Sequence, residues 1–110
     1  MTDTLRPRDR ARAFTPELAA LVDDPLFAQV WERPGLSRRD RSLITVAALV
    51  ALYRPEQLGP NLVRAVENGV TKEELSEAIT HLAFYGGFPA AISASAIATE
   101  TLGALETKGK

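Results

Sequence analysis

The sequence predicts an all-α protein. Alanine, which favours helix, accounts for 17 of the 110 residues. No stretch alternates apolar and polar residues for long enough to predict a β-strand. Glycine and proline fall mostly where helices are expected to begin or end, and the length is that of one domain. We therefore expect a single bundle of five or six helices with short links.

Two short helices are predicted at the start of the folded part, separated by a bend. Thr15 is a hydroxyl cap followed by a proline at the first helical position, which starts a helix over residues 16–22. Asp24 and the proline after it repeat that signal and start a helix over residues 25–32. Residues 1–14 contain arginines interspersed with acidic residues and proline, which predicts a flexible, solvated tail.

A long helix is predicted after Ser37, which caps it together with Asp40 in a variant of the capping box. This helix is expected to end near Tyr53, because Pro55 follows and the residue before a proline resists the α region. Residues 43–52 are apolar on nearly every side. We therefore predict that other subunits bury part of this helix and that the chain is oligomeric.

Pro55 starts the next predicted helix, since proline is pre-organised for the first helical position. The Gly59-Pro60 pair is expected to kink this helix or to delay its start. Asn68-Gly69 suits the left-handed conformation and ends the helix. Its buried side is expected to carry Leu58, Leu62, Val63 and Val66.

Thr71 and Glu74 form a capping box for a helix over residues 72–85. Two glycines that follow directly, at positions 86 and 87, stop this helix. At about 100° per residue, its apolar face carries Leu75, Ala78, Ile79 and Leu82.

Pro89 opens a last predicted helix, which extends to about Leu105. The start of this helix is rich in alanine and serine, and such small residues allow other helices to approach closely. The folded domain is thus expected to span residues 15–106, with residues 107–110 as a C-terminal tail.

Charge and composition exclude several function classes. Thirteen basic and fourteen acidic residues leave a net charge of −1, which argues against binding to nucleic acid or to acidic membranes. Cysteine is absent, which excludes disulfides, thiolate metal sites, iron–sulfur clusters and cysteine nucleophiles. A single histidine makes a multi-histidine metal site impossible within one chain, although an oligomer could supply several. We expect no metal.

No targeting or membrane segment is evident. The apolar run at residues 43–52 is about half as long as a membrane span. The arginine-rich N-terminus is not followed by the apolar core and cleavage site of a secretory signal. A soluble cytoplasmic protein is therefore expected.

The most specific chemistry lies on the helix predicted over residues 72–85. Glu77, His81 and Tyr85 are spaced i, i+4, i+8 and form a stripe separate from the apolar face. A carboxylate one turn before an imidazole can orient the ring for proton transfer near neutral pH, and the phenol adds a donor. The alternative is a solvated surface pair with no catalytic role, since most Glu and His residues four apart on a helix lie on such surfaces.

Two further positions are candidates for substrate binding. Gly86 permits the close approach of either a ligand or a neighbouring helix. Arg41 lies at the edge of the apolar run, where a guanidinium can bind a substrate carboxylate in a bidentate manner. The alternative for Arg41 is an ion pair with Asp40, with Glu32 or with another subunit.

Three segments then combine into a recognisable pattern. RPGLSRRDRSLIT occupies residues 33–45, ENGVTKEE residues 67–74 and HLAFYGGFPAA residues 81–91. In this order and at these separations they resemble the signatures of the carboxymuconolactone decarboxylase family. The resemblance covers roughly residues 25–103, nearly the whole folded part.

The resemblance implies the all-α fold shared with alkylhydroperoxidase-like proteins, assembled as trimers or hexamers. The namesake activity removes carbon dioxide from 4-carboxymuconolactone in aromatic catabolism, without a metal or organic cofactor. Relatives with a Cys-x-x-Cys pattern instead reduce peroxides through a dithiol. The equivalent segment here, residues 54–61, has neither thiol, which excludes the peroxidase branch.

The resemblance also implies roles for individual residues. His81 becomes the proton donor, oriented by Glu77, in a cofactor-independent decarboxylase that acts on a small cyclic carboxylate or lactone. Tyr85 and Asn61 would bind the lactone oxygens, and Arg41 a carboxylate. Asn61 stands where decarboxylase-like members usually carry histidine, and an amide cannot shuttle protons. The alternative function is therefore a non-catalytic oligomeric protein of the same fold that binds small molecules or acts as a scaffold.

Overall fold

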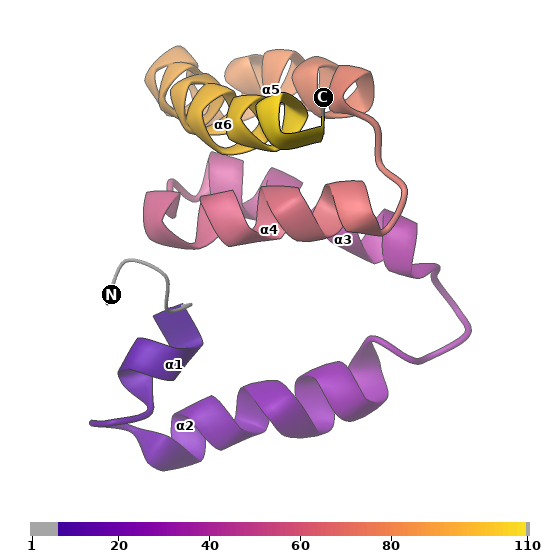
Figure 1. Cartoon of the computed structure of the whole chain (residues 1–110), viewed down its shortest axis with the longest axis vertical. Coiled ribbons are helices and arrows are strands. Elements are labelled where there is room, and N and C mark those ends of the chain that lie inside the picture. The colour runs from indigo at the N-terminus through magenta and orange to yellow at the C-terminus, as the bar shows by residue number, and fades with distance from the viewer. Residues whose placement is uncertain (1–6, 110) are drawn as a thin grey trace. The chain divides into compact units, whose positions relative to one another are not determined.

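The computed structural model describes residues 7–109, without the side chains at position 8 and from residue 104 onward. In this range the regular secondary structure is entirely helical, which confirms the predicted all-α class (Figure 1). The elements are α1 (Pro7–Ala11), α2 (Pro16–Leu21), the π-helical η2 (Val22–Val30), α3 (Arg38–Ala51), α4 (Pro55–Glu67), α5 (Lys72–Gly86) and α6 (Phe88–Gly109). No described helix has the length and apolarity needed to cross a membrane.

The chain divides into two compact units, residues 1–38 and 39–110. In the first unit, α2 and η2 occupy the region of the two predicted short helices. The predicted bend is at Asp24, which leaves the helical backbone region with φ −151° and ψ 116°. Helix α1 lies within the stretch expected to be a tail. The flexibility of residues 1–14 and the domain limits of 15–106 stay predictions.

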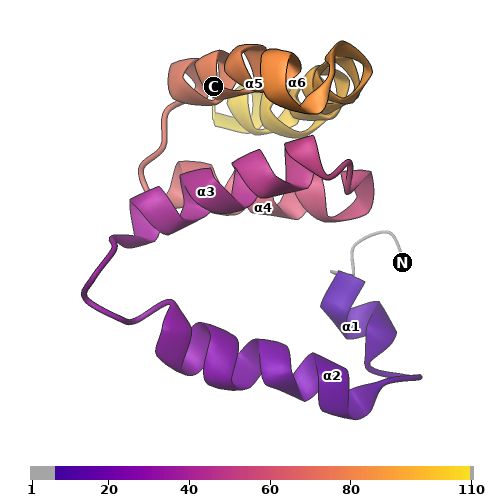
Figure 2. The same cartoon turned by 180° about the vertical axis from the view of Figure 1, so that it is seen from behind.

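The second unit contains α3, α4, α5 and α6. Helix α6 packs against both α5 and α4, and Figures 1 and 2, seen from opposite sides, both show α5 beside α6. All four helices contribute to one apolar core, together with Val70 from the loop before α5. The buried core residues are Val46, Val50, Leu58, Leu62, Ala65, Val70, Leu75, Ile79, Ala83, Ala91, Ala94 and Leu102.

The helix-by-helix predictions of burial are largely confirmed. Leu58 and Leu62 of α4 are buried, whereas Val63 and Val66 are half-buried. In α5, Leu75 and Ile79 are buried, and Ala78 and Leu82 are half-buried. On α3 the apolar run presents Val46 and Val50 to the core but leaves Ile44 and Leu52 exposed, so its burial by other subunits stays a prediction.

Helix α4 excludes one of the two effects expected of Gly59-Pro60, the delayed start, whereas the kink stays a prediction. It begins directly at Pro55 and continues through Pro60 to Glu67, so its start is not delayed. Pro60 removes one backbone donor, and the carbonyl four residues earlier belongs to Glu56. Both Pro60 and Glu56 are exposed, and water can therefore satisfy that carbonyl.

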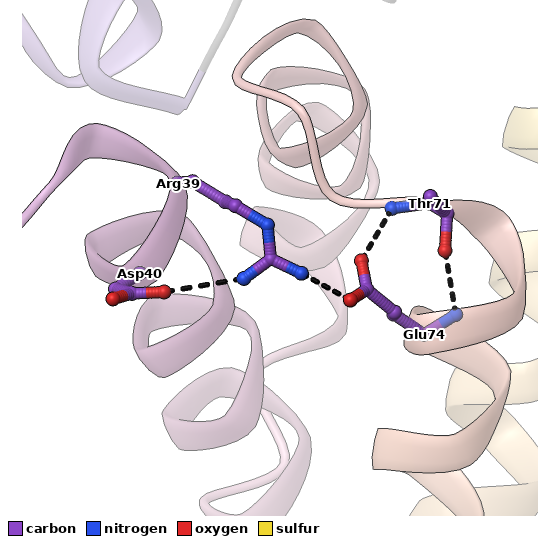
Figure 3. Close-up of polar contacts among 4 residues, drawn as sticks. All are labelled: Arg39, Asp40, Thr71 and Glu74. Carbon is purple, nitrogen blue, oxygen red and sulfur yellow. Dashed lines mark hydrogen bonds and ion pairs between the residues drawn. The ribbon is translucent and has the colours of Figure 1, made fainter.

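The start of α5 is fixed by the predicted capping box. The Thr71 hydroxyl accepts a hydrogen bond from the Glu74 N–H at 3.0 Å, and the Glu74 carboxylate accepts one from the Thr71 N–H at 2.9 Å. The Arg39 guanidinium, from the start of α3, bonds the same carboxylate and contacts Asp40 at 3.2 Å (Figure 3). Hydrogen bonds from the Thr71 backbone and from Arg39 lower the pKa of Glu74.

The end of α5 lies against α3. A Cβ atom added to Gly86 would be 2.9 Å from the Ala51 Cα, which is closer than real side chains approach. Of the two alternatives for Gly86, the structure thus shows the neighbouring helix. The next residue, Gly87, has φ +105° and ends the helix in a conformation that favours glycine.

We expect Gly86→Ala to lower the free energy of unfolding by about 1–3 kcal/mol, because the new methyl group forces α5 away from Ala51. Denaturant unfolding of both proteins measures the difference. Gly103→Ala is the matched control, since a Cβ there meets nothing within 4 Å in a helix interior. A Gly86→Ala protein as stable as the control would contradict the close approach.

We expect Glu74→Gln to reduce stability at neutral pH, because glutamine keeps the size of the side chain but loses its charge. The unfolded carboxyl has its ordinary pKa of 4.5, and the pKa of the folded carboxyl is lower. The stabilisation is therefore fully present above the unfolded pKa and is lost as pH falls through the folded pKa.

Urea unfolding of wild type and Glu74→Gln from about pH 7 to about pH 3 tests this linkage. The difference between them should shrink at the acidic end. Glu73→Gln removes a neighbouring carboxylate outside the capping box and serves as the control. A difference for Glu74→Gln that does not change with pH would disprove the assignment.

Candidate active site

A surface hollow of about 500 Å³ lies along the outer side of α5. Its lining consists of Leu43 from α3 and of Glu73, Glu74, Glu77, Ala78 and His81 from α5. The two residues predicted to be catalytic, Glu77 and His81, therefore share one hollow. Both are exposed, so a ligand can reach them from solvent.

The third member of the predicted stripe packs on the histidine. The rings of His81 and Tyr85 lie 4.9 Å apart between centroids, tilted by 32°. Tyr85 is 77% exposed, which leaves its phenol accessible at the edge of the hollow. In the described part of the chain, Glu77 and His81 are not joined by a hydrogen bond, so orientation of the ring by Glu77 stays a prediction.

The hollow is acidic. Glu73, Glu74 and Glu77 all line it, and the Glu74 carboxylate is held by the Thr71 backbone and by Arg39. An anionic ligand entering the hollow meets like charges unless a cation also faces it. In the described part of the chain, no group of three His, Asp or Glu side chains is arranged to hold a metal ion.

The other predicted binding residues lie outside the lining of this hollow. Asn61, on α4, donates from its amide to the Gln57 carbonyl at 2.8 Å and accepts from the Arg64 guanidinium at 3.0 Å. Arg41 is half-buried on α3. The substrate-binding roles of Asn61 and Arg41 stay predictions, as does a ligand at Gly86.

Sequence reasoning missed Arg39, which bonds a carboxylate of the hollow. The segment Arg39-Asp40-Arg41 offered two arginines at the start of one helix, and we selected Arg41 for its place beside the apolar run. Residues two apart on a helix point in directions about 160° apart. Which arginine faces α5 is therefore decided by tertiary packing, and no local signal identifies it.

The sequence is similar to known proteins over most of its length. The sequence model described as "Carboxymuconolactone decarboxylase family" matches residues 16–100. A 4-carboxymuconolactone decarboxylase from Acinetobacter baylyi is 39% identical over 95 residues, which cover 86% of this chain and 71% of the relative. A nitrosuccinic acid decarboxylase from Metarhizium robertsii is 35% identical over 100 residues, covering 91% of this chain and 70% of the relative.

A third relative, an uncharacterized 15.0 kDa protein from Paracoccus denitrificans, is 34% identical over 88 residues, which are 77% of this chain and 65% of that protein. The chain contains no cysteine, so the Cys-x-x-Cys motif is absent. The matched region runs from α2 into α6 and contains the hollow and its histidine. The chain belongs to the carboxymuconolactone decarboxylase family.

Proposed function

We propose that this protein is a cofactor-independent decarboxylase that acts on a small cyclic carboxylate or lactone of the 4-carboxymuconolactone type. The observation that carries the proposal is the placement of the lone histidine. His81 lines a solvent-accessible hollow with Glu77 and packs against Tyr85, in a chain 39% identical to a 4-carboxymuconolactone decarboxylase.

In the proposed reaction the substrate loses carbon dioxide and gains one proton. The bond between the carboxylate carbon and the ring breaks, and its electron pair is delocalised through an alkene toward the lactone carbonyl. His81 then delivers a proton to carbon, with Glu77 orienting the imidazole. The developing negative charge on oxygen needs hydrogen-bond donors, a role that we assign to Tyr85 and Asn61.

Charge in the hollow constrains how the substrate binds. Glu73 and Glu77 repel the carboxylate of the substrate, so binding requires a cation that contacts this carboxylate from the side away from them. We assign that role to Arg41. Arg39 supports the site differently, since its contact with Glu74 offsets one of the three negative charges.

The names of the relatives widen the range of acids that should be tested. One is named for a lactone acid and the other for nitrosuccinic acid, an open-chain acid. Carbonyl and nitro groups both accept the electron pair that a departing carboxylate leaves behind. The shared requirement on the substrate is therefore an electron-accepting group, and a ring is not essential to the chemistry.

We expect purified protein to release carbon dioxide from 4-carboxymuconolactone or from nitrosuccinic acid. The His81→Ala variant should have a kcat lower by at least ~10²-fold, because the proton donor is lost. Carbon dioxide release, followed with each acid, measures this. Glu100→Gln, an exposed change on α6, is the control and should keep wild-type activity. No turnover of either acid by wild type contradicts the decarboxylase proposal, and near-normal His81→Ala activity removes His81 from its role.

Asn61 supports a second candidate function, a non-catalytic small-molecule-binding protein of the same fold. Its amide is already engaged by the Gln57 carbonyl and by Arg64, and it cannot shuttle protons. Calorimetric binding of 4-carboxymuconolactone without carbon dioxide release would favour this function over the enzyme.

If the enzyme proposal holds, we expect Asn61→Ala to raise KM by about tenfold, the value of one net hydrogen bond to substrate, about 1.4 kcal/mol. Steady-state kinetics with wild type and variant measure the change. Asn61→Gln, which retains the amide one methylene further out, is the comparison. An unchanged KM in Asn61→Ala would remove Asn61 from substrate binding.

A further inference from the structure

The imidazole of His81 has few contacts that fix its orientation. It is exposed on α5, and among the described residues it makes neither a hydrogen bond nor an ion pair. Its ring contact is with Tyr85, at 4.9 Å between the two centroids. An exposed side chain without a partner exchanges among several staggered rotamers. Within the part of the chain that the structure describes, the tyrosine ring is therefore the restraint on the imidazole.

The geometry of α5 places the ring of Tyr85 over the turn that carries His81. Residues four apart lie on the same side of a helix, and helical side chains lean toward the N-terminus. The separation of 4.9 Å falls in the range in which aromatic rings attract each other. A pair of this kind favours one side-chain arrangement over the others by about 2–10-fold.

The backbone that carries Tyr85 is itself held in place. Ala83, two residues earlier, is buried in the core, and Gly86, the next residue along the chain, lies against Ala51 of α3. The tyrosine ring therefore stands on a fixed base, although its phenol end is exposed. A ring anchored in this way can restrict the imidazole that it contacts.

Tyr85 is not part of the lining of the acidic hollow, whereas Glu77 and His81 are. The tyrosine ring thus contacts the imidazole from outside the hollow. It restricts the histidine without filling the space that a ligand beside Glu77 needs.

We propose that Tyr85 is a positioning residue, whose ring holds the His81 imidazole in one orientation beside the acidic hollow. A carboxylate on one ring nitrogen, the role given to Glu77, selects the tautomer, whereas packing against the ring selects the rotamer. The proposed role needs the tyrosine ring and not its hydroxyl. Only the effect on the reaction rests on the proposed function, in which the donor must be aligned before the proton moves.

The lone histidine makes a direct test possible, because the untagged full chain gives one Hε1 and one Hδ2 signal from an imidazole. A neighbouring aromatic ring shifts protons above its face upfield. We expect at least one of the two signals to lie further upfield in wild type and in Tyr85→Phe than in Tyr85→Leu. Nuclear Overhauser contacts from His81 to the ring at position 85 should accompany this shift.

Three-bond couplings of the His81 β-protons measure the populations of its rotamers. One rotamer should dominate in wild type and in Tyr85→Phe, and several should be populated in Tyr85→Leu. Tyr53→Leu is the matched control, since it removes the other tyrosine, in the link between α3 and α4, and should leave the His81 signals unchanged. Circular dichroism checks that each variant is folded.

Steady-state kinetics with 4-carboxymuconolactone or nitrosuccinic acid test the effect on the reaction. Tyr85→Phe loses the phenol and keeps the ring, whereas Tyr85→Leu loses both, so the ratio of their kcat values isolates the ring. We expect kcat of Tyr85→Leu to be at least ~3-fold lower than kcat of Tyr85→Phe. Equal kcat values in the two variants overturn the positioning role.

His81 signals and rotamer populations that are the same in wild type and in Tyr85→Leu overturn the proposal as well. These readouts need no turnover, so they decide whether Tyr85 holds the imidazole even if neither acid is a substrate. A wild type that shows the expected signals but turns over neither acid contradicts the decarboxylase proposal alone.

Discussion

The functional part of the molecule depends on the contacts that the Glu74 carboxylate makes. It closes the capping box with Thr71 and also receives the Arg39 guanidinium from α3 (Figure 3). Each residue of a helix is rotated by about 100° from the one before, so the point where α5 begins and its anchoring to α3 set the direction of every later side chain. The shared surface of Glu77 and His81 follows from that anchor.

Contacts at the far end of α5 and along its inner side fix the orientation of this helix further. Leu75, Ile79 and Ala83 enter the core, and Gly86 lies so close to Ala51 that no side chain fits between the two helices. A helix held at both ends and along one side has a single outer face. That face carries the acidic hollow with Glu77 and His81.

Local signals predicted most of this arrangement. The hydroxyl cap at Thr71, the glycine pair after Tyr85 and the i, i+4 spacing of Glu77 and His81 depend on residues a turn apart. The structure confirms the ends of α5, and it places Glu77 and His81 in one hollow, while their catalytic roles stay predictions. Features that depend on distant residues were not predictable. Pro60 and Glu56 are exposed, so water can satisfy the carbonyl that Pro60 leaves without a donor, and Arg39 reaches Glu74 from the start of α3.

The charge on the outer face of α5 follows from the positions of its residues around the helix axis. At about 100° per residue, Glu73, Glu77 and His81 lie within about 80° of one another, so the imidazole and two carboxylates share one side of the helix. An anionic substrate that approaches His81 therefore meets negative charge, and the contact of Arg39 with Glu74 offsets part of it. The ion pair at Glu74 thus has two effects, since it fixes the direction of α5 and reduces the repulsion that such a substrate meets.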